Sequence, residues 1–482
     1  MISTVLEGGT IVDGTGRPRF TTDVAIVGER VALVGDCADR DAVRRVDCRG
    51  KIVAPGFLDI SSRSSREWLE HPVSSSKIGQ GITTDIGGNC GDSRFFGWEE
   101  WRDADEFFAL AARGTTAPNV ASFVGLSDAR AASDPFAAIR AACESGALGV
   151  SLDLDGAAHD DALEAMRAAR AGGAPRASVH LGDDPSRIAS DLEDAIALAA
   201  RADVSLHVVH HHAAFAMHAG AVHRTLERID RARTRGADVT CDVYPYVATW
   251  IALASLLPPV VTPNALQDPT IAATAALALQ ARLGERWHEI MLAEVRGEAH
   301  AAWCGSRIDE IASAWRSSPA RALVTLVRDE PEARAFLFCM REDDVATALS
   351  APFCAIGTAA PSFALDPNAS FGGPHPRAFG AFARTIARFV RQKRSLDLEE
   401  AIRRMTSLPA AIAGIAERGT IAVDAYADLV VFEESAFVDA ATYARPYALP
   451  LGLAAIFVNG EPLAPGERRA RYPGHVLRGG HV

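Results

Sequence analysis

Several features of membrane, secreted and nucleic-acid-binding proteins are missing from this sequence of 482 residues. No run of about twenty uninterrupted apolar residues, the length that crosses a bilayer as a helix, occurs in it. The first residues contain no basic segment followed by an apolar one, so no secretory signal is expected. Lysine and arginine form no cluster, and the net charge is −12, which disfavours a phosphate backbone as partner. We therefore expect a cytoplasmic protein with no membrane and no nucleic-acid partner.

Cysteine is also scarce, with 8 residues that form no CxxC motif and no close pair. This spacing excludes a disulfide framework and suits a reducing compartment. The chain is 48% hydrophobic, which is enough for one large domain and a smaller companion with its own core. No sequence feature decides the oligomeric state, so a homo-oligomer stays open.

Short strand patterns separated by glycine-rich turns occupy both ends of the sequence. They cover residues 3–7, 23–27, 30–34, 427–432 and 454–463, and the last one surrounds an Asn459-Gly460 turn signal. We predict that the two ends pair into one small antiparallel β domain, formed by residues 1–54 and 419–482.

Between these ends, buried apolar runs such as SLHVVH alternate with amphipathic stretches such as DPSRIASDLEDAIALAARA. Strand followed by helix, repeated, is typical of a parallel α/β array. We therefore predict a TIM (β/α)8 barrel over residues 55–418. Residues from about 258 to 334 look mostly helical and interrupt the alternation, so we expect an insertion there.

Functional side chains of such a barrel follow the carboxyl ends of its strands. Cys90 follows GITTDIGGN, His180 ends RASVH, and His210 ends SLHVVH. One cysteine and two histidines suit a zinc site with an open fourth position. Each residue alone is more common as a packed residue at a strand end, so the spacing by itself leaves both interpretations open.

A series of motifs runs along the chain in this order: GGTIVDGTGRPRF, VAPGFLD, QGITTDIGGNCG, GALGVS, DVYPY, GGPHPRAFGAFAR, MTSLPA and ADLVVF. Through these motifs, nearly the whole chain resembles the D-aminoacylases, which are N-acyl-D-amino-acid deacylases of the amidohydrolase superfamily and have similar motifs in the same order. The resemblance implies one zinc per chain, held by Cys90, His180 and His210. It also implies that Tyr244 and Arg377 clamp the carboxylate of a small-molecule ligand, for which arginine offers a bidentate fork.

The sequence departs from this family at two strand ends. Ser61 and Arg63 stand where the family has a His-x-His pair for a second, weaker metal position, and a permanently charged guanidinium disfavours a second zinc there. Gly357-Thr358-Ala359-Ala360 stands where the family has Gly-Ser-Asp-Gly, so Ala359 replaces the aspartate that serves as general base. Loss of such a base costs roughly two to four powers of ten in rate.

The residue that replaces the base is unknown, and the candidates near predicted strand ends are His212, Asp153 and Asp183. Histidine has the most suitable ordinary pKa for proton transfer near neutrality. Trp250 stands where the resemblance implies a small hydroxyl residue. It could narrow the pocket, stack on an acyl group or simply pack the insertion.

Three functions remain in view. The first is a diverged zinc enzyme that binds an N-acyl amino acid or related amide, with slow C–N hydrolysis, acyl transfer, epimerisation or cyclisation as its chemistry. The second is a non-catalytic family member that acts as a binding protein or an inactive partner subunit. The third is an ordinary N-acyl-D-amino-acid deacylase. The first agrees best with a chain that keeps the metal ligands and the carboxylate clamp but lacks the base.

Overall fold

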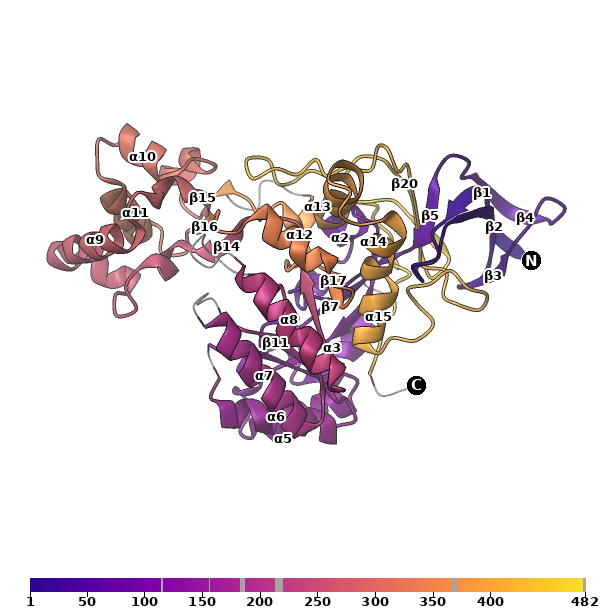
Figure 1. Ribbon diagram of the computed structural model, residues 1–482, viewed down its shortest axis with the longest axis horizontal. Helices are drawn as coiled ribbons and strands as arrows, with labels where there is room; N and C mark the ends of the chain where they lie inside the picture. Colours follow the sequence, from indigo (N-terminus) through magenta and orange to yellow (C-terminus); the bar gives the residue numbers. More distant parts are fainter. Residues whose placement is uncertain (114–115, 156, 183–186, 213–219, 366–370, 480–482) are drawn as a thin grey trace.

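The computed structural model describes the chain except for residues 114–115, 156, 183–186, 213–219, 366–370 and 480–482. Figure 1 shows three parts along the long axis: a sheet that contains the N-terminus, a central α/β body, and a lobe that carries α9, α10 and α11. In the described part of the chain, no helix is long and apolar enough to cross a membrane.

The central body contains parallel strands that follow one another in chain order. One sheet has the order β6-β7-β8, from strands Phe57–Asp59, Ile82–Gly87 and Asn119–Ser122. The next has the order β9-β10-β11-β12-β13-β17, from strands Val124–Gly125, Val150–Asp153, Arg176–His180, Ser205–Val208, Val239–Val243 and Cys354–Ile356. Only Phe123 separates β8 from β9.

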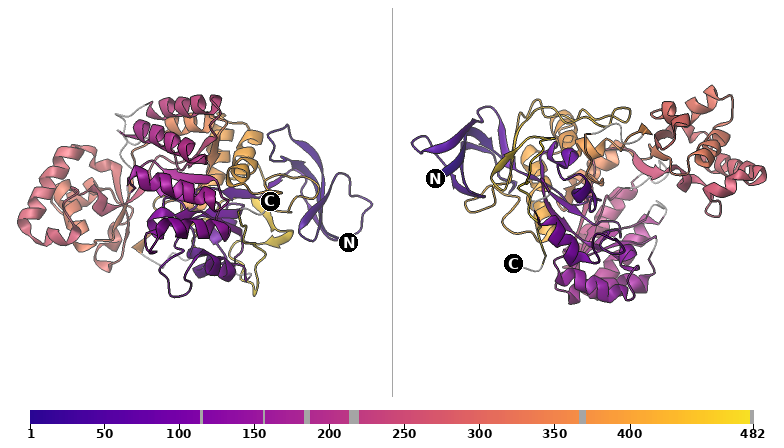
Figure 2. Two further views of the ribbon diagram at one scale, coloured as in Figure 1. Left: turned by 90° about the horizontal axis from the view of Figure 1, so that it is seen from below. Right: turned by 180° about the vertical axis from the view of Figure 1, so that it is seen from behind.

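Helices cover the outer face of these strands, as Figure 2 shows. They include α5 (Pro135–Glu144), α6 (His159–Ala171), α7 (Ile188–Ala202) and α8 (Ala221–Thr234). In α7 the buried residues recur at helical spacing, with Ile188, Leu192, Ala195 and Leu198 on the inner face. The strands between the helices and the interior are buried, which explains their nearly continuous apolar runs.

The closed barrel that the sequence predicts is not seen as a continuous ladder in the described residues, because β8 is not paired with β9 and β17 is not paired with β6. A side chain spans the seam between β17 and β6 instead: the carboxylate of Asp59 accepts a 2.9 Å hydrogen bond from the backbone N–H of Thr358. The observed body is thus an α/β array of two parallel sheets.

Both ends of the chain contribute to one further sheet, with the order β21-β20-β19-β5-β1-β2-β3 and β4 on β1. Its strands are Ile2–Ile11 (β1), Phe20–Val27 (β2), Arg30–Val34 (β3), Ala42–Asp47 (β4), Ile52–Pro55 (β5), Leu429–Phe432 (β19), Leu453–Val458 (β20) and Glu461–Leu463 (β21).

This sheet is mixed, so the prediction of a purely antiparallel module was wrong. The first strand is long enough for β4 and β5 to lie one after the other beside it, and both run parallel to it. The hairpin from β20 to β21 agrees with its turn signal: Asn459 and Gly460 have φ of 47° and 77°, as a tight hairpin turn requires.

The lobe is helical only in part. It contains α9 (Pro269–Leu283), α10 (Ile308–Ala314) and α11 (Pro319–Asp329) around their own apolar core. It also contains an antiparallel sheet with the order β14-β16-β15-β18, from strands Thr249–Ala252, Arg334–Leu337, Ile290–Val295 and Phe371–Gly372. The prediction of a mostly helical segment missed this sheet, because short apolar runs flanked by helix formers fit either structure.

Candidate metal and anion site

Cys90, His180 and His210 lie at the carboxyl ends of parallel strands and come together in space. The Sγ atom of Cys90 is 3.4 Å from Nε2 of His210, and the ring centres of His180 and His210 are 4.6 Å apart. Cys90 and His210 have φ of 57° and 36°, values that side chains other than glycine rarely adopt. Strained backbone of this kind is typical of functional sites.

The donor atoms of this group suit zinc, which binds one thiolate and two imidazoles in many proteins. Sulfur and nitrogen ligands on one tetrahedral zinc lie about 3.5 Å apart, close to the observed separation of Cys90 and His210. Nδ1 of His180 lies 3.3 Å from Oδ1 of Asp153, a contact of the kind that orients an imidazole ligand. In the described residues, however, no three His, Cys, Asp or Glu side chains are already grouped as a metal site. The types of donor atom and the separation of Cys90 and His210 fit zinc, and the His180 ring lies close to the His210 ring.

The surroundings of His210 favour its neutral form. Burial lowers its pKa well below the ordinary value, and the charges of His180, His212, Arg377 and Arg63 lower it further. A neutral imidazole keeps the lone pair that a metal ligand needs.

The three candidates for the missing base have different surroundings. Burial raises the pKa of Asp153, but the hydrogen bond and charge of His180, the backbone hydrogen bond from Asp155 and the charge of Arg63 together lower it by more. The Nδ1–H of His212 donates to the carbonyl oxygen of His210 over 2.6 Å, and the two rings are stacked. Asp183 lies outside the described residues. The structure therefore describes the surroundings of Asp153 and His212 but identifies neither residue as the base.

Arg377 begins α13 (Arg377–Arg384) and is 5% exposed. Its Nη2 donates to the carbonyl oxygen of Ala359 over 3.0 Å, while its Nε and Nη1 have no hydrogen-bond partner in the described part of the chain. Its guanidinium lies 4.5 Å from the ring centre of Tyr244. Arg377 makes no ion pair with a described carboxylate, so two buried nitrogen atoms, Nε and Nη1, can still donate to an anion.

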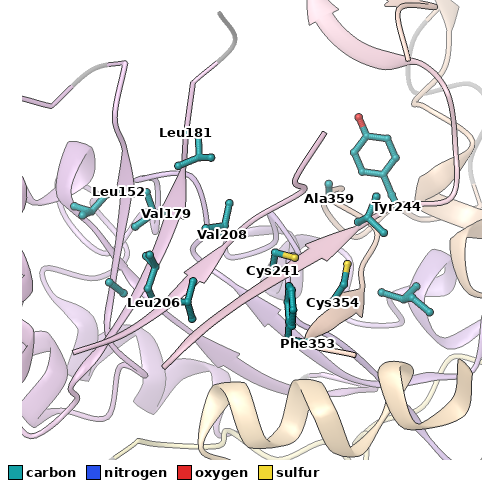
Figure 3. Close-up of a cluster of buried hydrophobic side chains, with 14 of the residues drawn as sticks. Leu152, Val179, Leu181, Leu206, Val208, Cys241, Tyr244, Phe353, Cys354 and Ala359 are labelled. Carbon is teal, nitrogen blue, oxygen red and sulfur yellow. The ribbon is translucent and has the colours of Figure 1, made fainter. Parts of the chain in front are cut away.

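The two departures from the family pattern lie beside each other. The backbone N–H of Arg63 contacts the carbonyl oxygen of Ala360 at 3.4 Å, which places Arg63 next to the turn after β17. Ala359 occupies this turn with φ of 48°. Figure 3 shows Ala359 and Tyr244 beyond the ends of neighbouring strands β17 and β13. The Oγ of Ser61 is buried without a partner among the described residues.

A cavity of about 760 Å³ opens at these strand ends, between the central body and the lobe. The body contributes Arg63, Ala359 and Arg377, and the lobe contributes Trp250, Glu294 and Arg334. Cys90, His180 and His210 do not line this cavity. Arg377 links the two places, because it lines the cavity and its charge lowers the pKa of His210.

Trp250 lies on the lobe side of this cavity and packs against Arg334. The guanidinium of Arg334 lies 4.1 Å from the centre of the Trp250 ring, which is a cation–π contact. The two residues come from adjacent strands, β14 and β16.

Sequence reasoning missed two residues of this region, Lys77 and Arg334. Lys77 is fully buried, and its ammonium donates to Asp59 (2.6 Å), to Thr358 (3.0 Å) and to the carbonyl of Ala360 (2.8 Å). Asp59, an aspartate inside an apolar strand, was the available signal, because a buried carboxylate needs a cation. No local signal marks Arg334.

The amidohydrolase family matches residues 356–461 of the chain. The N-acyl-D-glutamate deacylase of Alcaligenes xylosoxydans xylosoxydans is 31% identical over 98% of this chain and 96% of its own length. The D-aminoacylase of the same organism is 30% identical over 95% of this chain and 94% of its own length. The crystal structure of N-acyl-D-glutamate deacylase from Bordetella bronchiseptica, complexed with zinc and a phosphonate inhibitor, has 29% identity and a TM-score of 0.84, and covers 99% of both chains.

Proposed function

Because this chain belongs to the D-aminoacylases of the amidohydrolase family, we propose that it binds an N-acyl amino acid or related amide at a single zinc and acts on it by altered chemistry. The proposal rests on one observation above all: Ala359 lines the same cavity as Arg377, whose Nε and Nη1 atoms have no hydrogen-bond partner among the described residues. The chain keeps Arg377, which would bind the carboxylate, and has Ala359 in place of the aspartate that would act as the base.

The proposal includes a closed (β/α)8 barrel, formed when the two parallel sheets meet along the Asp59–Thr358 seam. It divides the chain into residues 1–54 and 419–482, which form the small domain, and residues 55–418, which form the barrel. Cys90, His180 and His210 would hold the zinc, with Asp153 as the positioning residue of His180. A zinc ion there supplies Lewis acidity toward a carbonyl oxygen.

Arg377 and Tyr244 bind the carboxylate of the ligand in this proposal. A carboxylate that accepts from Nη1 or from Nε of Arg377 would complete hydrogen bonds that the buried guanidinium lacks. The guanidinium of Arg377 lies over the face of the Tyr244 ring, and this cation–π contact orients it. Retention of this pair supports a small-molecule carboxylate as the ligand.

Hydrolysis in this chain lacks a proton acceptor at residue 359. The family position is filled by alanine, so hydrolysis of the amide would run roughly two to four powers of ten more slowly than with the base. The altered chemistry is slow C–N hydrolysis, acyl transfer, epimerisation or cyclisation, and each of these reactions would take its proton acceptor from a group other than residue 359.

Ala359→Asp tests the proposal, with Ala359→Asn as the matched control. Aspartate and asparagine both adopt positive φ more readily than alanine, so neither variant should strain the turn at 48°. Only the aspartate adds a base. We expect Ala359→Asp to hydrolyse N-acyl amino acids about a hundredfold faster than the wild type, while Ala359→Asn does not. Zinc content and ligand affinity should stay close to wild type in both variants.

Other outcomes separate the remaining functions. Fast hydrolysis by the wild type would establish an ordinary deacylase and contradict the proposal. A zinc-loaded wild type that binds N-acyl amino acids but transforms none of them would identify a non-catalytic binding protein. Failure to bind any of them would reject the ligand class.

A further inference from the structure

A buried cation lies at the seam where β17 and β6 are not paired in the described part of the chain. It is the ammonium of Lys77, a fully buried residue of the short helix α2 (Ser75–Ile78). Two buried carboxylates face this ammonium, Asp59 at 2.6 Å and Asp85 at 3.3 Å. Lys77 therefore joins α2 to the strands that carry these aspartates, β6 and β7.

The same ammonium holds the turn that follows β17. It donates to Oγ1 of Thr358 over 3.0 Å and to the carbonyl oxygen of Ala360 over 2.8 Å. The backbone N–H of Thr358 donates to Asp59 over 2.9 Å, and the backbone N–H of Ala360 donates to the Thr358 hydroxyl over 3.2 Å. The residues on both sides of Ala359 are thus fixed by one buried pair of charges, Lys77 and Asp59.

The conformation of Ala359 needs this support. Its φ of 48° lies in the left-handed region, which is unfavourable for alanine because its Cβ comes too close to the backbone. Such a conformation persists only where the surrounding structure imposes it. Without the hydrogen bonds at Thr358 and Ala360, the turn would relax toward negative φ, and the peptide groups on both sides of Ala359 would rotate.

One of these peptide groups contacts Arg377. The carbonyl oxygen of Ala359 accepts the 3.0 Å hydrogen bond from Nη2 of Arg377. Because Nε and Nη1 have no hydrogen-bond partner among the described residues, this hydrogen bond and the face of the Tyr244 ring set the direction of the guanidinium. A rotated Ala359 carbonyl would leave the guanidinium free to adopt other rotamers, and a ligand would then have to order it on binding.

We propose that Lys77 is a positioning residue of the ligand site: it holds the Ala359 turn in the conformation that directs Arg377 into the cavity. This inference rests on the proposed function, because it concerns the arginine that binds the carboxylate there. Lys77 does not line the cavity, and its ammonium is already paired with two aspartates. It therefore acts on a ligand only through the turn and Arg377.

Three variants test this proposal. Lys77→Met removes the cation, Thr358→Val removes the hydroxyl that links the cation to the turn, and Thr358→Ser keeps that hydroxyl. The zinc-loaded proteins are titrated with N-acetylalanine, N-acetylmethionine and N-acetylglutamate, each as both enantiomers, by ligand-detected NMR. We expect Lys77→Met and Thr358→Val to weaken binding about tenfold. Thr358→Ser and the surface control Lys51→Met should stay within about twofold of the wild type.

The same titrations in an Arg377→Gln background separate positioning from a general loosening of the site. If Lys77 acts through Arg377, Lys77→Met and Thr358→Val cause no further loss of affinity once Arg377 is replaced. An equal loss in both backgrounds would overturn the proposal. Thermal unfolding verifies that each variant folds, and the comparison of Thr358→Val with Thr358→Ser decides the matter if Lys77→Met does not fold.

Crystal structures of the variants distinguish failure of this inference from failure of the proposed function. We expect Ala359 to leave the left-handed region in Lys77→Met and Thr358→Val, and Nη2 of Arg377 to lose the carbonyl of Ala359. An unchanged turn in Lys77→Met, or in Thr358→Val if Lys77→Met does not fold, overturns the positioning and leaves the proposed function standing. A wild type that binds none of the N-acyl amino acids overturns the proposed function, and the crystal structures then decide the positioning alone.

Discussion

The guanidinium of Arg377 lies 4.5 Å from the ring centre of Tyr244, and the matching pair Arg384 and Tyr246 lies at 4.7 Å along the same helix. The two pairs differ in their charge partners. Arg384 has Asp439 at 3.3 Å, whereas Arg377 makes no ion pair with a described carboxylate. One arginine of α13 is thus structural, and the other is available to a ligand.

Arg377→Lys should weaken the binding of an N-acyl amino acid by about ten- to a hundredfold, because lysine keeps the charge but not the bidentate fork. Arg384→Lys is the matched variant and should change thermal stability more than affinity. Calorimetry and thermal unfolding measure the two effects. Equal losses of affinity in both variants would count against the clamp.

Cys90→Ala should lose most of its bound zinc when the protein is purified without chelators, because a thiolate contributes strongly to zinc affinity. Cys143→Ala serves as the control, since Cys143 is buried and burial raises its thiol pKa to about 12. Elemental analysis gives the metal per chain. Full zinc content in Cys90→Ala would contradict the assignment.

Excess zinc should not add a second metal to the wild type, because Ser61 and Arg63 replace the two histidines that the family resemblance implies there, and a guanidinium repels a cation. The double variant Ser61→His and Arg63→His restores two imidazoles there. We expect its zinc content to rise above about one per chain when zinc is supplied in excess. A wild type that already binds two would refute the role of Arg63.

Lys77→Met should lower the free energy of unfolding by about 3 to 5 kcal/mol, because it leaves Asp59 and Asp85 buried without their cation. Burial already raises the pKa of Asp59 despite the charge of Lys77. Urea unfolding measures the loss. Lys51→Met is the control, since its ammonium donates to the backbone carbonyl of Asp47 at the surface, and a similar loss there would point to a general effect.

Glu342→Gln should destabilise the protein near neutral pH and much less in acid. The bidentate hydrogen bonds of Arg388, together with the hydrogen bond and charge of Lys393, lower the pKa of Glu342 from 4.5 to about 2. Because the folded-state pKa is the lower one, the stabilisation is present above about pH 4.5 and is lost as the pH falls toward 2.

Solvent screening limits this effect to roughly 1 kcal/mol or less. Urea unfolding of the wild type and Glu342→Gln at a series of pH values should show the two curves converging in acid. A constant gap between them would rule out ionisation of Glu342 as the cause.

Much of the fold could be predicted from local patterns. The strand pattern over residues 30–34 matches β3, and the family resemblance read from motifs such as VAPGFLD is confirmed by relatives that span nearly the whole chain. The parallel pairing of β1 with β4 and β5 could not be predicted, because the direction of a strand partner depends on the path of the chain and not on its alternation.

The site divides in the same way. Cys90 and His210 each follow an apolar strand, so their approach could be expected from the edge that parallel strands share. Arg334 could not be found, because its place depends on a sheet formed by strands that are distant in sequence and resemble helix. Lys77, between serine and isoleucine, reads as an ordinary surface lysine.

The turn at Ala359 also affects how readily a mutation could introduce an aspartate at this position. Its backbone holds a conformation that suits aspartate better than alanine, and the alanine codons GCT and GCC differ from the aspartate codons only in their middle base. A gene that encodes Ala359 by GCT or GCC therefore lies a single point mutation away from encoding a carboxylate in the cavity. Selection for hydrolysis in a mutagenised population should reach this substitution early, without any rearrangement of the fold.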